Sequence, residues 1–179
     1  MTGFKRVFIV LATGALALGG CGTDYCWRSN VPQEMRTVAV PTFRNETDVT
    51  ELGSLAARQV LREFQREGTF KVRSADEAAL EIQGVMKATS SGVQAYDRRQ
   101  GRRLAGYSLT AVAEVSVIDR RGGKVLVDNR RYRAETSYTA SQDKTTAMRD
   151  ASGRLAEDLA RQIVTDVLNL KWERRNEDE

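Results

Sequence analysis

Residues 107–118 read YSLTAVAEVSVI, which is the most regular alternation of apolar and polar residues in the chain. Successive side chains of a β-strand point to opposite faces of its sheet. One face of this segment is therefore apolar throughout, and consists of Tyr107, Leu109, Ala111, Ala113, Val115 and Val117. The other face is mostly polar. The pattern predicts a long strand with one face toward a core and the other toward water.

Two further strands are predicted on either side of this one. Residues 80–87 alternate in the same way, and we expect the strand to continue to Tyr96. After the central strand, Gly122-Gly123 has the composition of a hairpin turn and leads into a third long strand from Lys124 to Tyr138. Its alternation slips near Asp128-Asn129, which indicates a bulged residue. The three segments predict an antiparallel meander.

Apolar residues recur at helical spacing before and after the meander. The first stripe follows several helix N-cap candidates in residues 45–48, stops at Gly68, and consists of Leu52, Leu55, Ala56, Val60 and Phe64. The second starts near Gln142, extends for about 25 residues, or about 37 Å at 1.5 Å per residue, and includes Met148, Ala151, Leu155, Leu159, Ile163 and Val167. A short strand at Arg36–Val40 precedes the first helix, and Phe70–Arg73 is a short extended segment.

The order strand, helix, three strands, helix predicts an α+β fold. We expect a mixed or antiparallel sheet of about four strands, with both α-helices packed on one face. Residues 36–170 are enough for a single domain with a core of its own. Residues 171–179 are almost wholly charged, which predicts a disordered tail.

The N-terminus has the features of an export signal. Lys5 and Arg6 precede a mostly apolar run from Val7 to Leu18, which predicts a signal peptide over residues 1–20. That run is shorter than the roughly 20 residues of a membrane-spanning helix. The ending Leu18-Gly19-Gly20-Cys21 resembles a bacterial lipoprotein box, which implies a lipidated Cys21 at the mature N-terminus, followed by a linker to residue 35. The alternative is an ordinary secreted protein. Gly22, at the position where Asp marks retention at the inner membrane, favours the outer membrane.

Composition argues against several classes of function. Lys5 and Arg6 are the only charges before Cys21, so the mature chain has 28 − 2 = 26 basic residues against 24 acidic ones, which weakens a nucleic-acid interpretation. The chain has no histidine, and so lacks the commonest general base and the usual zinc ligand. We therefore predict no enzymatic activity, cofactor, metal or nucleic-acid partner; chemistry based on carboxylates alone is a remote alternative. Cys26 is either a free thiol or a bridge to another chain.

A family resemblance is carried by residues 36–47, which read RTVAVPTFRNET, together with the Cys-Gly start, the meander and the long closing helix. The sequence GKVLV at 123–127 and the segment from Ser137 to Ala151 belong to it as well. These features resemble LptE, the lipopolysaccharide-assembly lipoprotein family. The segment from Gly22 to Trp27 departs from the Gly-Tyr-His that follows the cysteine in many relatives.

The resemblance implies a non-enzymatic lipoprotein of the outer membrane that faces the periplasm. Such a protein plugs the outer-membrane β-barrel LptD, helps it assemble and contacts lipopolysaccharide. The strand VAVP followed by Phe-x-Asn also resembles lipoproteins similar to the curli-secretion channel subunit and to activators of peptidoglycan synthases. Such a regulator or channel subunit is the alternative function.

Basic clusters are the candidate contacts for lipopolysaccharide. The first, consisting of Arg98, Arg99, Arg102 and Arg103, falls at a predicted hairpin tip, where four guanidinium groups suit lipid A phosphates. The second consists of Arg120, Arg121 and Lys124, and successive hairpin tips should place it at the opposite end of the meander. Arg131 and Arg133 are expected on one side of the last strand, near Arg130. A solvated polar surface is the alternative for each cluster.

Overall fold

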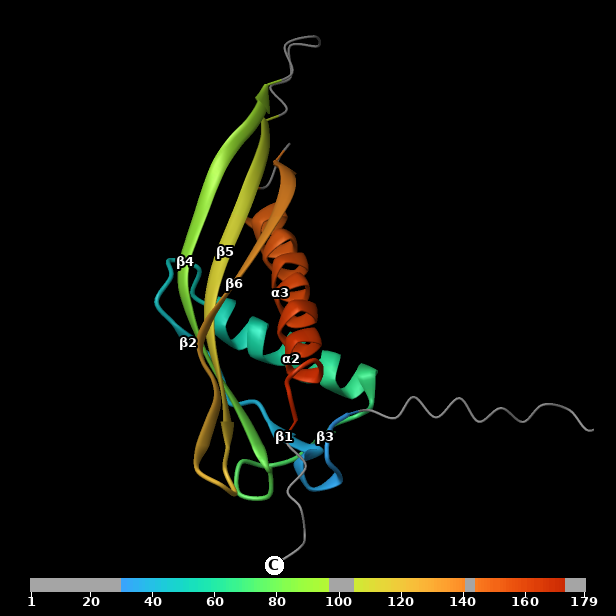
Figure 1. Ribbon diagram of the computed structural model, residues 1–179. Helices are drawn as coiled ribbons and strands as arrows, with labels where there is room; N and C mark the ends of the chain where they lie inside the picture. The colour runs from blue at the N-terminus through green and yellow to red at the C-terminus, as the bar shows by residue number, and fades with distance from the viewer. Residues whose placement is uncertain (1–29, 97–104, 141–143, 173–179) are drawn as a thin grey trace, which may run out of the picture.

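Three long antiparallel strands form the body of the protein in a computed structural model, which describes residues 30–96, 105–140 and 144–172. The strands β4 (Leu80–Tyr96), β5 (Ala105–Asp119) and β6 (Lys124–Ala140) pair in sequence order, β4 with β5 and β5 with β6 (Figure 1). The predicted meander is confirmed. The alternation in β5 is confirmed as well, because Leu109, Ala111, Ala113, Val115 and Val117 are all buried.

Three short strands complete a mixed, six-stranded sheet. Strand β1 (Thr37–Ala39) lies between β3 (Lys71–Val72) and the start of β4, parallel to both. Strand β2 (Arg44–Asn45) pairs in parallel with β4 farther along. The sheet thus has more strands than the four expected, because a two-residue strand is too short to show a period of two.

Two α-helices, α2 (Leu52–Glu67) and α3 (Lys144–Leu168), lie on one face of the sheet, as predicted (Figure 1). Helix α3 runs along the strands, and α2 crosses it. Gly68 ends α2 in a left-handed conformation with φ of 84°. The expected N-cap is absent from the start of α2, where no side chain caps the helix. The Asn45 side chain instead donates to the carbonyl of Val49 at 2.8 Å and accepts from the backbone of Thr47 at 3.2 Å, and so fixes the loop before the helix.

The hydrophobic core lies between the sheet and the two helices. Both predicted helical stripes contribute to it, and its largest fully buried side chains include Phe64, Leu80, Ile82, Met86, Leu155, Leu159 and Ile163. The core also includes residues on both sides of the span 36–170. Val31 is only 2% exposed, and the ring of Trp172 lies 6.3 Å from that of Phe70, measured between centroids. The packed part of the chain therefore begins before Arg36 and ends after Leu170.

A bulge in β6 stands where the alternation slips. Val115 pairs with Arg130 and Val117 with Val127, so Asp128 and Asn129 together oppose a single residue of β5. Asn129 has a φ of 42°, a left-handed conformation that asparagine tolerates better than most residues. The bulge predicted from sequence is confirmed.

Gly84 of β4 is required by close packing. A Cβ at this position would lie 2.5 Å from the ring of Phe43, which is only 3% exposed. We expect Gly84→Ala to lower the free energy of unfolding by about 1–3 kcal/mol, because the buried ring would have to move. Gly153→Ala is the matched control: a Cβ in α3 there meets nothing within 4 Å, and alanine should stabilise the helix by about 0.5–1 kcal/mol. Urea denaturation measures both; changes of the same sign would contradict this packing.

Candidate functional site

The first predicted basic cluster, Arg98, Arg99, Arg102 and Arg103, lies outside the described residues. The described residues on either side of it in the sequence, Tyr96 and Ala105, are cross-strand partners at the ends of β4 and β5. The cluster therefore belongs to the connection of the β4–β5 hairpin. Its contact with lipopolysaccharide stays a prediction.

The second basic cluster, Arg120, Arg121 and Lys124, lies at the turn between β5 and β6. This turn joins the opposite end of β5, where Asp119 pairs with Leu80 on one side and with Lys124 on the other. The carboxylate of Asp119 accepts hydrogen bonds from the backbone N–H of Arg121 at 2.9 Å and of Gly122 at 3.1 Å. The strand ends next to the two clusters are thus opposite ends of β5, as expected.

Within this turn, Arg120 is bound to the sheet. Its guanidinium group donates to the carboxylate of Glu81, and Glu81 also accepts from the amide of Gln83 at 2.9 Å. The hydrogen bond from Gln83 contributes most to lowering the pKa of Glu81, and the bond from Arg120 lowers it further. Burial acts in the opposite direction, but the pKa stays below its ordinary value. Arg121 and Lys124 are exposed at the tip. Arg120 therefore serves to fasten the turn, whereas the other two side chains face solvent.

The lowered pKa of Glu81 predicts an acid-dependent loss of stability. The ordinary pKa is 4.5 and the folded-state value lies below it, so the carboxylate stabilises the fold above pH 4.5 and this contribution is lost as the pH falls through the folded-state value. We expect Glu81→Gln to lose less stability than the wild type between pH 6 and about pH 3. Urea denaturation across this range measures the difference. A variant whose stability falls in parallel with that of the wild type would contradict the assignment.

A row of alternating charges crosses the sheet face that points away from the helices. Glu114 of β5 accepts from Nε of Arg131 on β6 at 2.9 Å and lies 3.7 Å from Nζ of Lys87 on β4. Lys87 also lies 3.0 Å from a carboxylate oxygen of Glu46, which in turn pairs with Arg44 of β2. We call these five residues the charge row. Three positive and two negative side chains give it a net charge of +1, and it links four strands.

The arginines of β6 divide between the two sides of the sheet. Arg131 and Arg133 are exposed and alternate with the buried residues Tyr132 and Ala134, so both lie on the open face, as predicted. Arg130 lies after the bulge and pairs instead with Asp166 of α3 at 2.8 Å. The hydroxyl of Tyr132 donates to the same carboxylate at 2.9 Å; burial, and then this bond, raise the pKa of Tyr132. Arg130 thus helps to fasten the helix to the sheet.

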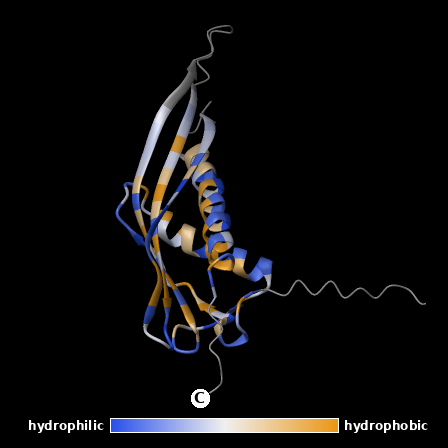
Figure 2. Cartoon of the chain, viewed as in Figure 1, coloured by the Kyte–Doolittle hydropathy of each residue, from blue (hydrophilic) through white to orange (hydrophobic). Residues whose placement is uncertain are grey.

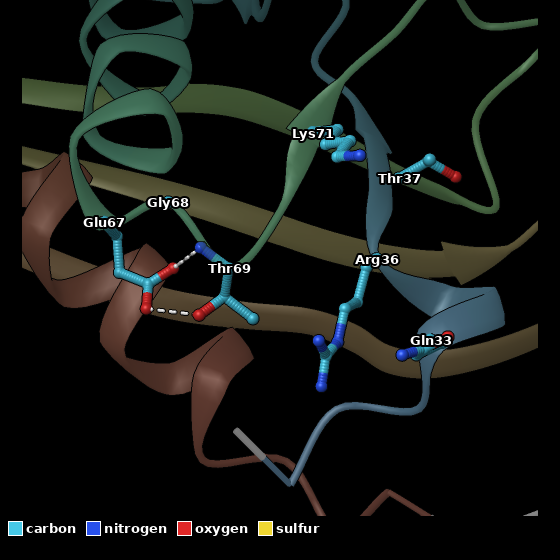
Figure 3. Close-up of a pocket in the computed structure, with 7 residues that line it drawn as sticks. All are labelled: Gln33, Arg36, Thr37, Glu67, Gly68, Thr69 and Lys71. Atoms are coloured by element: carbon cyan, nitrogen blue, oxygen red, sulfur yellow. Dashed lines mark hydrogen bonds between the residues drawn. The ribbon is translucent and has the colours of Figure 1, made fainter. Parts of the chain in front are cut away.

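A polar hollow of about 850 Å³ lies at the base of the sheet, the end that carries β1 and β3 (Figure 3). Its lining consists of Gln33, Arg36, Thr37, Glu67, Gly68, Thr69 and Lys71. The carboxylate of Glu67 accepts from the backbone N–H and the hydroxyl of Thr69, at 2.8 and 2.6 Å. Nε of Arg36 donates to the carbonyl of Val31 at 3.0 Å. The hollow thus combines two cationic side chains with one carboxylate that is already bound.

Sequence reasoning missed both the charge row and the hollow. The hollow joins two segments that are distant in sequence, 33–37 and 67–71, and the pairing of Thr37 with Lys71 brings them together. The contacts of the charge row depend on which residues of neighbouring strands lie opposite each other, and the alternation within a single strand does not predict this register. Throughout the described part of the chain, no three His, Cys, Asp or Glu side chains gather as metal ligands. None of the helices in that part is long and apolar enough to cross a membrane.

The family model described as LptE, lipopolysaccharide-assembly, matches residues 35–167 of the chain. No curated protein matches the chain.

Solved structures share the fold at low sequence identity. The hypothetical protein CT253 from Chlamydia trachomatis has a TM-score of 0.52 and 15% identity, covering 75% of this chain and 96% of its own. A protein from Xanthomonas campestris has a TM-score of 0.50 and 13% identity, with coverages of 74% and 82%. The uncharacterized lipoprotein B from Nitrosomonas europaea has a TM-score of 0.44 and 15% identity, with coverages of 77% and 81%. The first two structures show a shared fold and nothing more specific.

Proposed function

The chain belongs to the LptE lipopolysaccharide-assembly family, and we propose on this basis that it is the plug and assembly partner of an LptD-like outer-membrane β-barrel. The extent of the family match carries the proposal. Residues 35–167 run from the end of the 3₁₀-helix η2 (Gln33–Met35) to the last turn of α3, and so include every strand of the sheet. The role is one of assembly, without catalysis. Lipidation at Cys21 would hold the domain to the outer membrane, facing the periplasm.

The open face of the sheet suits a place inside a barrel. The interior of an outer-membrane barrel is polar, and the face of the sheet away from the helices carries the charge row together with Ser108, Thr110 and Ser116. Figure 2 shows the apolar residues of β5 alternating with more polar ones. Among the described residues, Val125 is the one large hydrophobic side chain that is exposed, at 50%. Polar groups of a lumen could bind the polar and charged side chains of this face, and so compensate for the water that both surfaces would lose.

The length of the meander suits a contact far from the anchor. Strand β4 has 17 residues, which at about 3.3 Å per residue is about 56 Å. Residues 30–36, which lead from the predicted lipid anchor, enter the domain next to β1, at the base of β4. The arginines at 98–103 therefore follow the far end of a rod that is longer than the ~40–45 Å thickness of a bilayer. We propose that they bind the phosphates of lipopolysaccharide, with Arg121 and Lys124 forming a separate basic tip at the base.

A pull-down tests this function. The lipidated chain is tagged, extracted from its own outer membrane in a mild detergent and captured, and the bound proteins are identified by mass spectrometry. We expect one large β-barrel protein in an amount equal to the chain. Recovery of a cell-wall synthase, or of the chain's own multimers alone, would instead favour the regulator or secretion-channel function.

A further inference from the structure

The two outer edges of the meander differ in how the fold protects them. At the edge formed by β6, two side chains of α3 donate hydrogen bonds to backbone carbonyls of the strand. Gln162 donates to the carbonyl of Arg133 at 3.1 Å, and Arg154 donates to the carbonyl of Ser137 at 3.1 Å. Exposed charges on the same strand include Arg131, Arg133 and Glu135. Charged side chains and covering elements are the usual means by which proteins prevent another strand from pairing with an edge. The β6 edge is therefore guarded.

The outer edge of β4 is covered only in its first half. Strand β1 pairs with Leu80 and Glu81, β2 pairs with Val85 and Met86, and the N–H of Glu46 donates to the carbonyl of Met86 at 2.9 Å. Beyond this point no strand in the described part of the chain pairs with the outer edge, and Figure 1 shows the upper half of β4 at the margin of the sheet. Register shifts beside Ala88 and after Val93 bound a regular stretch of backbone over residues 88–93.

This stretch carries none of the usual guards within it. Residues 88–92 read ATSSG, with neither charge nor proline, and four of the five are exposed. Figure 2 shows this part of β4 near the middle of the hydropathy scale. In an antiparallel strand, alternate residues turn their N–H and C=O groups to the outer edge, and such a row of unpaired groups is a template for a further strand. A molecule that guards one edge and leaves the other open is suited to pairing at the open one.

We infer that residues 88–93 of β4 receive an extended segment of the barrel partner, which adds to the sheet as a seventh strand. The inference rests on the proposed function and specifies one of its contacts. Main-chain hydrogen bonds would supply the affinity, as in other cases of strand addition, and the small side chains leave room for the added strand. Because the wall of a closed barrel has no free edge, the segment would come from a loop or a terminal part of the barrel protein.

A second copy of this chain suits the edge less well. Two identical edges pair about a two-fold axis with their strands antiparallel. The base of β4, next to the segment that leads to Cys21, would then lie at opposite ends of the joint sheet in the two copies. The lipid anchors of both copies would have to lie in the same membrane leaflet. A joint sheet that stands upright across the bilayer would instead place them on opposite sides of it. A strand from a barrel protein meets no such restriction.

The test introduces charged side chains that should prevent another strand from pairing with the open edge. The double variant Ala88→Lys/Ser90→Lys places two lysines at exposed positions of the open edge, and lysine is the commonest natural edge guard. The matched control, Ser137→Lys/Thr139→Lys, places the same two charges at exposed positions of β6, whose edge is already guarded. In the pull-down with full-length lipidated chains, we expect the β4 variant to recover at least tenfold less barrel protein than the wild type, and the control to recover the wild-type amount.

The outcomes separate this inference from the proposed function. Wild-type recovery with the β4 variant, or equal losses with both variants, would overturn the inference and leave the proposed function standing. No barrel protein with the wild type itself would contradict the proposed function and, with it, the inference. Hydrogen exchange of the wild-type chain provides a readout that does not depend on how the variants fold: the amides within residues 88–93 that face the open edge, every second one, should exchange at least tenfold more slowly in the recovered complex than in the chain alone. Unchanged exchange there would also overturn the inference.

Discussion

Cys21→Ser is expected to abolish acylation and to leave the chain without a membrane anchor. The substitution exchanges a sulfur atom for oxygen and removes the thiol to which the lipid would be attached. Each buried methylene of an acyl chain contributes about 0.8 kcal/mol to membrane affinity, so the loss of several chains should lower that affinity by many orders of magnitude.

Two measurements check the anchor. Labelled palmitate should enter the wild-type chain and not Cys21→Ser, and purified wild-type protein should sediment with lipid vesicles while the variant stays in solution. The use of purified protein excludes retention by a barrel partner. The chain contains its own control in its second cysteine, since Cys26→Ser should be acylated and sediment like the wild type. Labelling of Cys21→Ser, or its sedimentation with vesicles, would refute the lipoprotein assignment.

The second large effect is expected from the basic hairpin connection. Changing Arg98, Arg99, Arg102 and Arg103 together to Ser should weaken lipopolysaccharide binding by at least about tenfold, because one lost charged hydrogen bond already corresponds to about 1.5 kcal/mol. The residual binding should also depend less on salt, since fewer charges take part. Titration of the purified full-length chain with lipopolysaccharide at two salt concentrations measures both quantities.

A control with the same change in charge distinguishes a site from a general effect. Arg58, Arg62, Arg66 and Arg161 are all exposed on the two helices. Their joint substitution by Ser also removes four positive charges, and it should leave the affinity for lipopolysaccharide close to that of the wild type. Unchanged affinity and salt dependence in the variant that lacks Arg98, Arg99, Arg102 and Arg103 would disprove the hypothesis that these residues bind lipopolysaccharide. Equal weakening by both sets of substitutions would contradict it too, because the effect would then depend on net charge alone.

Elements with a burial period were predictable from the sequence. Strand β5 has one buried face, and its apolar residues therefore recur at every second position. Helix α3 has 25 residues, and its buried stripe keeps helical spacing from Ala151 to Val167. The slip at Asp128-Asn129 was visible for the same reason, since a bulge shifts the buried positions by one residue.

Features that depend on register or on short segments were not predictable. Strands β2 and β3 have two residues each, fewer than one full alternation. Lys87, Glu114 and Arg131 lie on three different strands, and their contacts depend on which residues stand opposite each other. The open edge of β4 was not predictable either, because its sequence is typical of a polar strand. The edge is uncovered because β1 and β2 are short and pair only with the first half of β4. The place of Arg120, Arg121 and Lys124 at the turn between β5 and β6 was predictable, but the hydrogen bond from Arg120 to Glu81 was not.

Native mass spectrometry of the detergent-solubilised, purified complex tests the central claim most directly. The account predicts one copy of this chain bound to one copy of an outer-membrane β-barrel protein, with lipopolysaccharide as an additional bound mass. An assembly made only of copies of this chain, or a complex with a cell-wall synthase, would contradict it.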